Sequence, residues 1–215
     1  MSACFSGVIK SEAELREILP PPYRRAVMKQ IDHLDDNCRS FIAHAPFVLV
    51  GTTNADGTGD VSPKGGPPGF VKMLDEHRLA FGELPGNNRA DGYRNLIANP
   101  AIGLIFLIPG VGETLRVNGR GYVLTDPELL EVCALDGRRP KLVLGVEVVE
   151  TFIHCAKALR RSALWEPDRW PDVSAMPAPA CMLVEHAEIE GDPDGSRTAA
   201  ALEENYATTL WNTAG

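Results

Sequence analysis

Four segments of the chain carry side chains whose types and spacing suit the binding of a small anion. The first runs from Asp60 to Gly69, where a strand leads into a loop that contains Ser62, Lys64 and several glycines. A hydroxyl, an ammonium group and a glycine backbone that allows close approach together suit a phosphate. The same residues also occur in ordinary Pro/Gly hairpin loops, and no Gly-Lys-[Ser/Thr] phosphate loop occurs in the sequence.

The second segment, Gly86 to Arg89, precedes a helix expected over residues 89–98. Backbone amides at a helix N-terminus attract anions, and the Arg89 guanidinium adds a positive charge. The alternative is an asparagine cap on a surface helix, which is a common feature.

The third segment is a strand expected over residues 114–124. Its alternation places Arg116, Asn118, Arg120 and Tyr122 on one face. This face suits either a polar ligand or the solvated outside of a barrel. On the opposite face, the glycines at 119 and 121 leave room for a backbone or a ligand to approach.

The fourth segment, His154 to Trp165, concentrates basic side chains in an acidic protein and adds Ser162 and an indole that can stack on a planar ring. No second Cys or His stands at metal-ligand spacing from the pair His154-Cys155, so no metal site is predicted. Cys155 is expected to be a small buried hydrophobic residue.

No motif of a protease, of a hydrolase or of a dinucleotide-binding fold is found: HExxH, GxSxG and GxGxxG are all absent. The side chains therefore offer no obvious reaction of their own, and no catalytic residue can be named. A bound cofactor is the natural source of chemistry.

The composition is that of a globular chain of 215 residues with 44% hydrophobic residues and a net charge of −8. This charge argues against a nucleic-acid or anionic-membrane partner. The longest apolar run, Ala101 to Ile108, is far below the roughly 20 residues of a membrane span. No secretory signal is visible, and the five scattered cysteines indicate reduced thiols, so a cytoplasmic location is expected.

The pattern of elements predicts a mainly antiparallel sheet with flanking helices, closed as a barrel. A capping box at Ser11 predicts a first helix, and a second helix is expected from Tyr23 with Val27, Ile31 and Leu34 at helical spacing. Further strands are expected at 47–53, 70–74, 78–83, 101–108 and 142–149. Asn54 to Gly57 predicts a hairpin turn, Asp126 and Pro127 predict a helix start, and a last helix is expected around 198–211.

In this order the four segments resemble the pyridoxamine 5′-phosphate oxidase-related, FMN-binding split-barrel proteins. The resemblance covers roughly residues 40–166 and rests on Ser62-Pro63-Lys64-Gly65, Gly86-Asn87-Asn88-Arg89, Pro109-Gly110 through Glu113-Thr114-Leu115-Arg116-Val117-Asn118-Gly119, and His154 through Trp165. It implies a six-stranded antiparallel split β-barrel over 46–166. The sequence pattern outside this range predicts a helical segment at 1–45 packed on the barrel and a helical extension at 167–215. The resemblance also implies a homodimer with FMN bound in each of two clefts at the interface, to which both subunits contribute.

The resemblance further implies which residues contact FMN. The phosphate would be held by side chains from several motifs, while Val61 and Ser62 would approach the isoalloxazine through backbone groups. Trp165 would either cover the ring or close the cleft from the partner chain. The complete set of expected contacts is Val61, Ser62, Lys64, Gly65, Asn88, Arg89, Arg116, Asn118, Arg161, Ser162 and Trp165.

Two departures from the family pattern bear on the polar wall of the site and on the substrate, respectively. The chain has Gly82-Glu83-Leu84-Pro85 where this branch usually has Pro-Asp-Arg-Pro, so an arginine is missing at position 84. The chain also lacks the Arg-x-His pair that the oxidases use on pyridoxamine phosphate, which is therefore not the expected substrate.

Three functions are compatible with these features. The first is an FMN-dependent oxidoreductase that exchanges a hydride with a reduced nicotinamide, a deazaflavin or another small molecule. The second is a non-catalytic flavin-binding protein for storage, sensing or regulation. The third is a haem-binding relative on the same barrel, with His154 as the candidate ligand.

Overall fold

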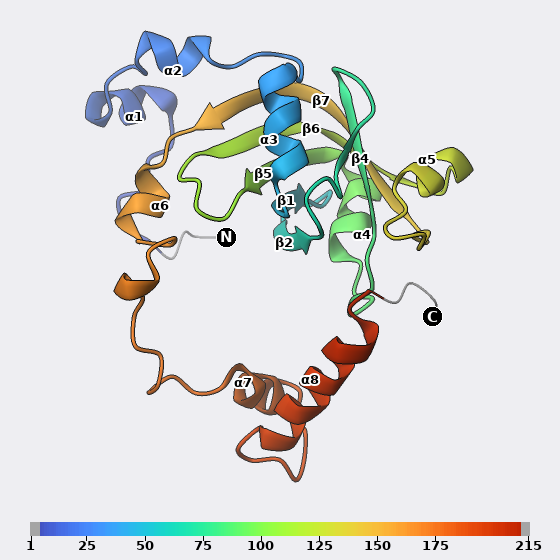
Figure 1. Cartoon of the computed structure of the whole chain (residues 1–215). Helices are drawn as coiled ribbons and strands as arrows, with labels where there is room; N and C mark the ends of the chain where they lie inside the picture. The colour runs from blue at the N-terminus through green and yellow to red at the C-terminus, as the bar shows by residue number, and fades with distance from the viewer. Residues whose placement is uncertain (1–4, 212–215) are drawn as a thin grey trace.

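The computed structural model describes residues 5–211, and its centre is one antiparallel sheet of seven strands in the order β2-β1-β5-β6-β7-β4-β3 (Figure 1). The strands are β1 (Phe47–Thr53), β2 (Gly59–Gly65), β3 (Lys72–Met73), β4 (Arg78–Gly82), β5 (Ala101–Leu107), β6 (Thr114–Leu124) and β7 (Val143–His154). The predicted mainly antiparallel architecture with flanking helices is confirmed.

The sheet has one strand more than the six that the family resemblance implies, and it is not closed. Among the described residues, β2 and β3 each pair on one side only, with β1 and β4 respectively. In the segment from Asp60 to Gly69, where a strand that leads into a loop is expected, strand β2 continues as far as Gly65. It pairs with β1 from Phe47↔Gly65 to Thr53↔Gly59, across the predicted Asn54–Gly57 turn.

The core lies on one face of the curved sheet, because the inner side chains of neighbouring strands alternate with outer ones. Strands β1 and β5 both bury every second residue. The largest completely buried side chains include Val48, Leu79, Phe81, Leu104, Phe106, Val117 and Leu144. Ile42 of α3 (Asp36–His44) joins this core.

Two glycines of β6 permit close packing, as predicted. A Cβ at position 119 would lie 2.0 Å from the Glu147 carbonyl oxygen, and a Cβ at position 121 would lie 2.9 Å from Leu96. The first contact is with the backbone of β7, next to the register shift after Asn118. Strand β7 itself continues to His154, five residues beyond the predicted end at 149.

The prediction of one helix that begins at Tyr23 and carries Val27, Ile31 and Leu34 is wrong. The segment contains α2 (Arg24–Met28) and α3, which begins only after Asp35 caps it through the Cys38 amide at 2.8 Å. Between them, Ile31 forms an isolated β-bridge with Thr151 through two backbone hydrogen bonds of 3.0 and 2.8 Å. A pairing with a distant strand therefore interrupts the helical pattern.

The remaining helices flank the sheet or extend from it. They are α1 (Glu12–Ile18), α4 (Asp91–Ala98), α5 (Pro127–Val132), α6 (Lys157–Arg161), the 3₁₀ turn η1 (Pro167–Arg169), α7 (Pro179–His186) and α8 (Ser196–Thr209). The predicted caps Ser11 and Asp126 are confirmed. None of the helices in the described part of the chain is long and apolar enough to cross a membrane.

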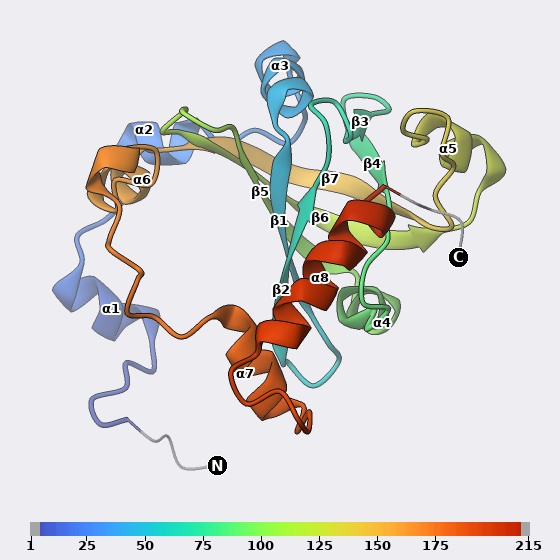
Figure 2. The ribbon, with the colours of Figure 1, turned by 60° about the horizontal axis from the view of Figure 1, so that its bottom comes forward.

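The C-terminal segment forms a hairpin of α7 and α8 that stands apart from the sheet for most of its length (Figure 1). Helix α8 runs from α7 back toward the β4–α4 connection, as both views show (Figure 1 and Figure 2). This helix buries no residue of its own, yet its end returns to the sheet domain. That return brings Leu210 and Trp211 to the candidate site.

Candidate functional site

A cavity of about 750 Å³ lies between β2, the β4–α4 connection and the first turn of α4. Its volume is within the range of about 300–1,000 Å³ that small-molecule sites usually have. Strand β2 alternates, so that Asp60, Ser62 and Lys64 share the half-buried inner face. All three line the cavity.

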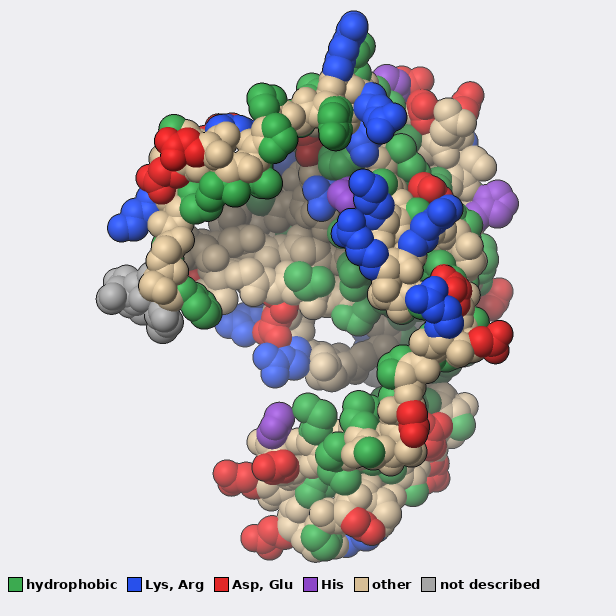
Figure 3. Space-filling model, turned by 90° about the vertical axis from the view of Figure 1, so that its left-hand side faces the viewer, with side chains coloured by type: hydrophobic (Ala, Val, Ile, Leu, Met, Phe, Trp, Pro, Cys, Tyr) green, Lys and Arg blue, Asp and Glu red, His purple; other side chains and the backbone are tan. Residues whose placement is uncertain are grey.

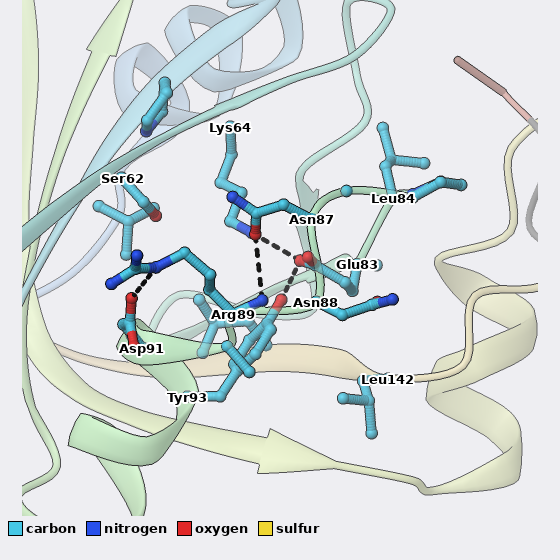
Figure 4. Close-up of a pocket in the computed structure, with 18 of the residues that line it drawn as sticks. Ser62, Lys64, Glu83, Leu84, Asn87, Asn88, Arg89, Asp91, Tyr93 and Leu142 are labelled. Carbon is cyan, nitrogen blue, oxygen red and sulfur yellow. Dashed lines mark hydrogen bonds and ion pairs between the residues drawn. The ribbon is translucent and has the colours of Figure 1, made fainter. Parts of the chain in front are cut away.

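Lys64 is fixed by an acidic partner from the β4–α4 connection (Figure 4). Its Nζ donates to Glu83 Oε2 at 2.7 Å, and both side chains are about three-quarters buried. The hydroxyl of Tyr93, on α4, donates to the same carboxylate oxygen. Lys64 Nζ also lies 5.2 Å from the centre of the Tyr93 ring, so three elements meet in one polar cluster.

The Tyr93 phenol is kept protonated by this environment. Burial is the main cause that raises its pKa above the ordinary tyrosine value, and the Glu83 carboxylate raises it further. The hydroxyl therefore acts as a hydrogen-bond donor, which leaves Glu83 as the acceptor for both neighbours.

The other end of the polar wall is the first turn of α4. Asn88 and Ala90, which precede this helix, both have a φ of 57°, in the left-handed region. No side chain in the described residues caps the first turn of α4. Its leading amides therefore have no intrahelical partner, and the turn borders the cavity.

The Arg89 guanidinium stands next to this helix start. Its Nε donates to Asp91 Oδ2 at 2.7 Å, and this bond raises the pKa of Arg89. The backbone amide of Arg89 donates to Asn87 Oδ1 at 3.0 Å, which shapes the connection (Figure 4). A guanidinium has five N–H donors, so others are left for a ligand.

The structure gathers five of the eleven expected contacts around this cavity: Ser62, Lys64, Gly65, Asn88 and Arg89. The side chain of Val61 points to the opposite side of β2 and is 66% exposed. A backbone contact from Val61, as expected from the resemblance, is still compatible with this orientation.

Arg116 and Asn118 lie elsewhere, on the face of β6 where alternation predicts them. Arg116 stacks over the Phe152 ring at 5.4 Å, and Asn118 donates to Glu150 at 2.5 Å. His154 lies 6.4 Å from Phe152, and its pKa is lowered by burial and by the nearby Arg116.

Arg161, Ser162 and Trp165 lie on and after α6, also away from the cavity. Figure 3 shows basic side chains gathered on this face of the molecule, which includes the exposed Lys157, Arg160 and Arg161. The Trp165 indole donates to the Val111 carbonyl at 2.9 Å, and the Ser162 hydroxyl donates to Leu159. Cys155 is exposed, so its prediction as a buried residue is wrong, because β7 ends just before it.

Several cavity residues were not predicted from the sequence. Glu83 and Tyr93 form the cluster with Lys64, Asp91 pairs with Arg89, and Leu210 and Trp211 come from the end of α8. A signal existed for Tyr93, which follows Arg89 by one helical turn. No group of three or more potential metal ligands occurs among the residues that the structure describes.

The family model described as pyridoxamine 5'-phosphate oxidase matches residues 34–155, which is more than half of the chain. The chain therefore belongs to this family, and the suspected resemblance is confirmed. The match includes β1 to β7 and α4, the elements that build most of the cavity. No curated protein sequence matches the chain.

Solved structures with a similar course of the chain include HupZ of Group A Streptococcus, with 21% identity and a TM-score of 0.45, covering 55% of this chain and 92% of that one. A putative pyridoxamine 5'-phosphate oxidase from Lactobacillus delbrueckii has 20% identity and a TM-score of 0.43, and the match covers 57% of this chain and 99% of that one. An FMN-binding protein from Syntrophomonas wolfei has 13% identity and a TM-score of 0.41, and the match covers 66% of this chain and 95% of that one.

Proposed function

We propose that the chain binds FMN in this cavity and acts as an FMN-dependent oxidoreductase on a small molecule. The observation that carries the proposal is the juxtaposition of an uncapped α4 start and Arg89 with Ser62 and Lys64 of β2 on one cavity wall. Family membership supports a flavin as the cofactor.

The residues present fit a phosphomonoester at one end of the cavity. The backbone between Asn88 and Ala90 has the positive φ angles that let successive amides converge on an anion, and the helix start adds partial positive charge. The Arg89 guanidinium supplies charge-assisted donors at the same place. This end of the cavity would therefore hold the FMN phosphate.

The second group of donors, on β2, would hold the ring system. Ser62 can donate through its hydroxyl, and Lys64 is kept in one position by Glu83 and Tyr93. A fixed cation next to a flavin ring stabilises negative charge on it, so Lys64 would tune the ring electronically. When bound, FMN supplies hydride transfer, and the chain supplies binding, orientation and charge.

We further propose that a second copy of this chain completes the site. Five of the expected FMN contacts do not line the cavity of their own chain: Arg116, Asn118, Arg161, Ser162 and Trp165. A phosphate carries nearly two negative charges, and the cavity's own cations are both paired with carboxylates. Cations from a partner would balance this charge, in agreement with the dimer that the resemblance implies.

The haem alternative lacks support from the site. No histidine is among the residues that line the cavity in the described part of the chain, so a haem ligand would have to be the His154 of the second copy, beside Phe152. A non-catalytic flavin-binding role differs from the proposal only in turnover. Oxidation of reduced nicotinamide or deazaflavin by the FMN-loaded protein would separate these two.

The proposal is tested by loading the protein with FMN, desalting it and recording its visible absorption. We expect retained flavin bands, and we expect Arg89→Ala to weaken FMN binding by about 1.5–3 kcal/mol, the value of a hydrogen bond to a charged group. Arg94→Ala is the control, because Arg94 is on the same helix but does not line the cavity.

A protein that stays colourless after loading would refute FMN as the ligand. Equal FMN affinity in the Arg89→Ala and Arg94→Ala variants would refute the proposed position of the FMN phosphate at the start of α4. For the dimer, Arg116→Ala should also weaken FMN binding by about 1.5–3 kcal/mol. An unchanged affinity would take Arg116 out of the site.

A further inference from the structure

The cavity has a polar end and an apolar end, and they lie on opposite sides of the Lys64–Glu83 pair. Figure 4 shows Ser62, Arg89 and Asp91 on one side of this pair and Leu84 and Leu142 on the other. Leu210 and Trp211 also line the cavity, and the reddish chain that follows α8 enters Figure 4 on the side of Leu84. The two ends therefore differ in the kind of group that they can contact favourably.

The apolar end is built partly by the C-terminal extension. Helix α8 ends at Thr209, and the next two residues are those that line the cavity. Trp211 is 41% exposed and Leu210 is 55% exposed, so both keep apolar surface that a ligand can cover. Large apolar side chains that remain partly exposed at a cavity rim are typical of ligand-binding surfaces.

The charges of the cavity disfavour an anionic group at this end. Three carboxylates line the cavity, from Asp60, Glu83 and Asp91, against the two cations Lys64 and Arg89. Lys64 is paired at 2.7 Å with Glu83, and Arg89 is paired at 2.7 Å with Asp91. Among the described lining residues, no unpaired cation stands at the apolar end to neutralise a phosphate or a carboxylate.

We infer that the apolar end is a substrate subsite for a flat, uncharged ring compound, with Trp211 and Leu84 as the residues that select it. This inference rests on the proposed function, since FMN takes the polar end. An aromatic ring of the substrate packs on Trp211 and on the leucine side chains, and burial of their apolar surface drives binding. An anionic substituent on that ring would be desolvated next to Glu83 without a partner, which disfavours it. A cationic substituent would compete with Lys64, which already pairs with Glu83 at 2.7 Å.

The test compares two ligands that share one ring, naphthol and naphthyl phosphate, on the FMN-loaded protein by titration calorimetry. We expect naphthol to bind at least tenfold more tightly than naphthyl phosphate. Trp211→Ala should weaken naphthol binding by roughly tenfold, the equivalent of an aromatic contact of about 1.4 kcal/mol. Trp170→Ala is the matched control, because Trp170 is 57% exposed and does not line the cavity.

A second variant tests the selectivity directly. Leu84→Arg places a cation at the apolar end and should invert the preference toward naphthyl phosphate, while FMN retention and the circular dichroism spectrum stay unchanged. The inference is overturned if naphthol fails to bind, if it binds equally to Trp211→Ala, or if Leu84→Arg leaves the preference as it was. In each of these cases retained FMN would leave the proposed function standing, whereas loss of FMN from the wild-type protein would overturn both.

Discussion

Removal of the Tyr93 hydroxyl should destabilise the protein by about 1.5 kcal/mol. The Tyr93→Phe change deletes one donor to the Glu83 carboxylate from a ring that is only 9% exposed. Hydrogen bonds to charged groups contribute about 1.5–3 kcal/mol. The lower end applies, because the Glu83 side chain is 28% exposed and keeps Lys64 as a second partner at 2.7 Å. At this chain length the loss corresponds to a melting temperature lowered by about 3–6 °C.

A double-mutant cycle measures whether the hydroxyl acts through Glu83. In a Glu83→Leu background Tyr93 has no carboxylate to donate to, so Tyr93→Phe should have almost no effect there, and the coupling free energy should be about 1.5 kcal/mol. Urea unfolding followed by far-ultraviolet circular dichroism gives all four stabilities. An equal loss in both backgrounds would refute the assignment, since the effect would then arise from packing.

The same cluster predicts a pH dependence at the alkaline side. Because burial and Glu83 raise the pKa of Tyr93, the folded protein holds this proton at a pH where the unfolded chain releases it near the ordinary value of about 10. The stabilisation is therefore complete below pH 10 and is lost as the pH rises above it. Tyr93→Phe should remove this part of the alkaline stability loss.

Two further predictions concern β6 and β7. In an NMR titration, His154 should have a pKa below the ordinary histidine value of about 6.5, because burial and then Arg116 lower it, and the free energy of unfolding should fall as the pH drops below 6.5. A titration midpoint above 6.5, or one that does not rise in the Arg116→Ala variant, would contradict this explanation. Gly119→Ala should destabilise the protein by about 3 kcal/mol, because the new methyl group would meet the Glu147 carbonyl, whereas Gly59→Ala, with open space around it, should have little effect in the same urea assay.

The parts of the fold that depend on local signals were predictable from the sequence. The bounds of β1 and β6 match the predicted ranges, because burial of one face imposes a period of two on their side chains. The caps Ser11 and Asp126 act through amides two or three residues away, so they too are visible in the sequence. The alternation of buried and exposed residues and the helix caps each depend on neighbouring residues only, so they reveal the bounds of these elements from the local sequence.

The parts that depend on distant partners were not predictable in this way. Ile31 has helical spacing from its neighbours, but its backbone pairs with Thr151, and nothing near Ile31 signals that bridge. Glu83 and Tyr93 are ordinary residue types, and their role appears only when β2, β4 and α4 meet around Lys64. Site residues of unusual type and spacing were therefore found, while their partners were not.

The two ends of the cavity are built by different parts of the chain. Ser62 and Lys64 of β2 and the start of α4 lie within the matched residues 34–155, so the proposed FMN end belongs to the family's common part. Leu210 and Trp211 lie outside that range and reach the cavity only through α8. Because separate segments form the two ends, changes in the C-terminal extension can alter the preferred substrate and leave the proposed cofactor contacts intact. Replacing Leu210 and Trp211 should thus change the affinity for ring compounds before it changes the affinity for FMN.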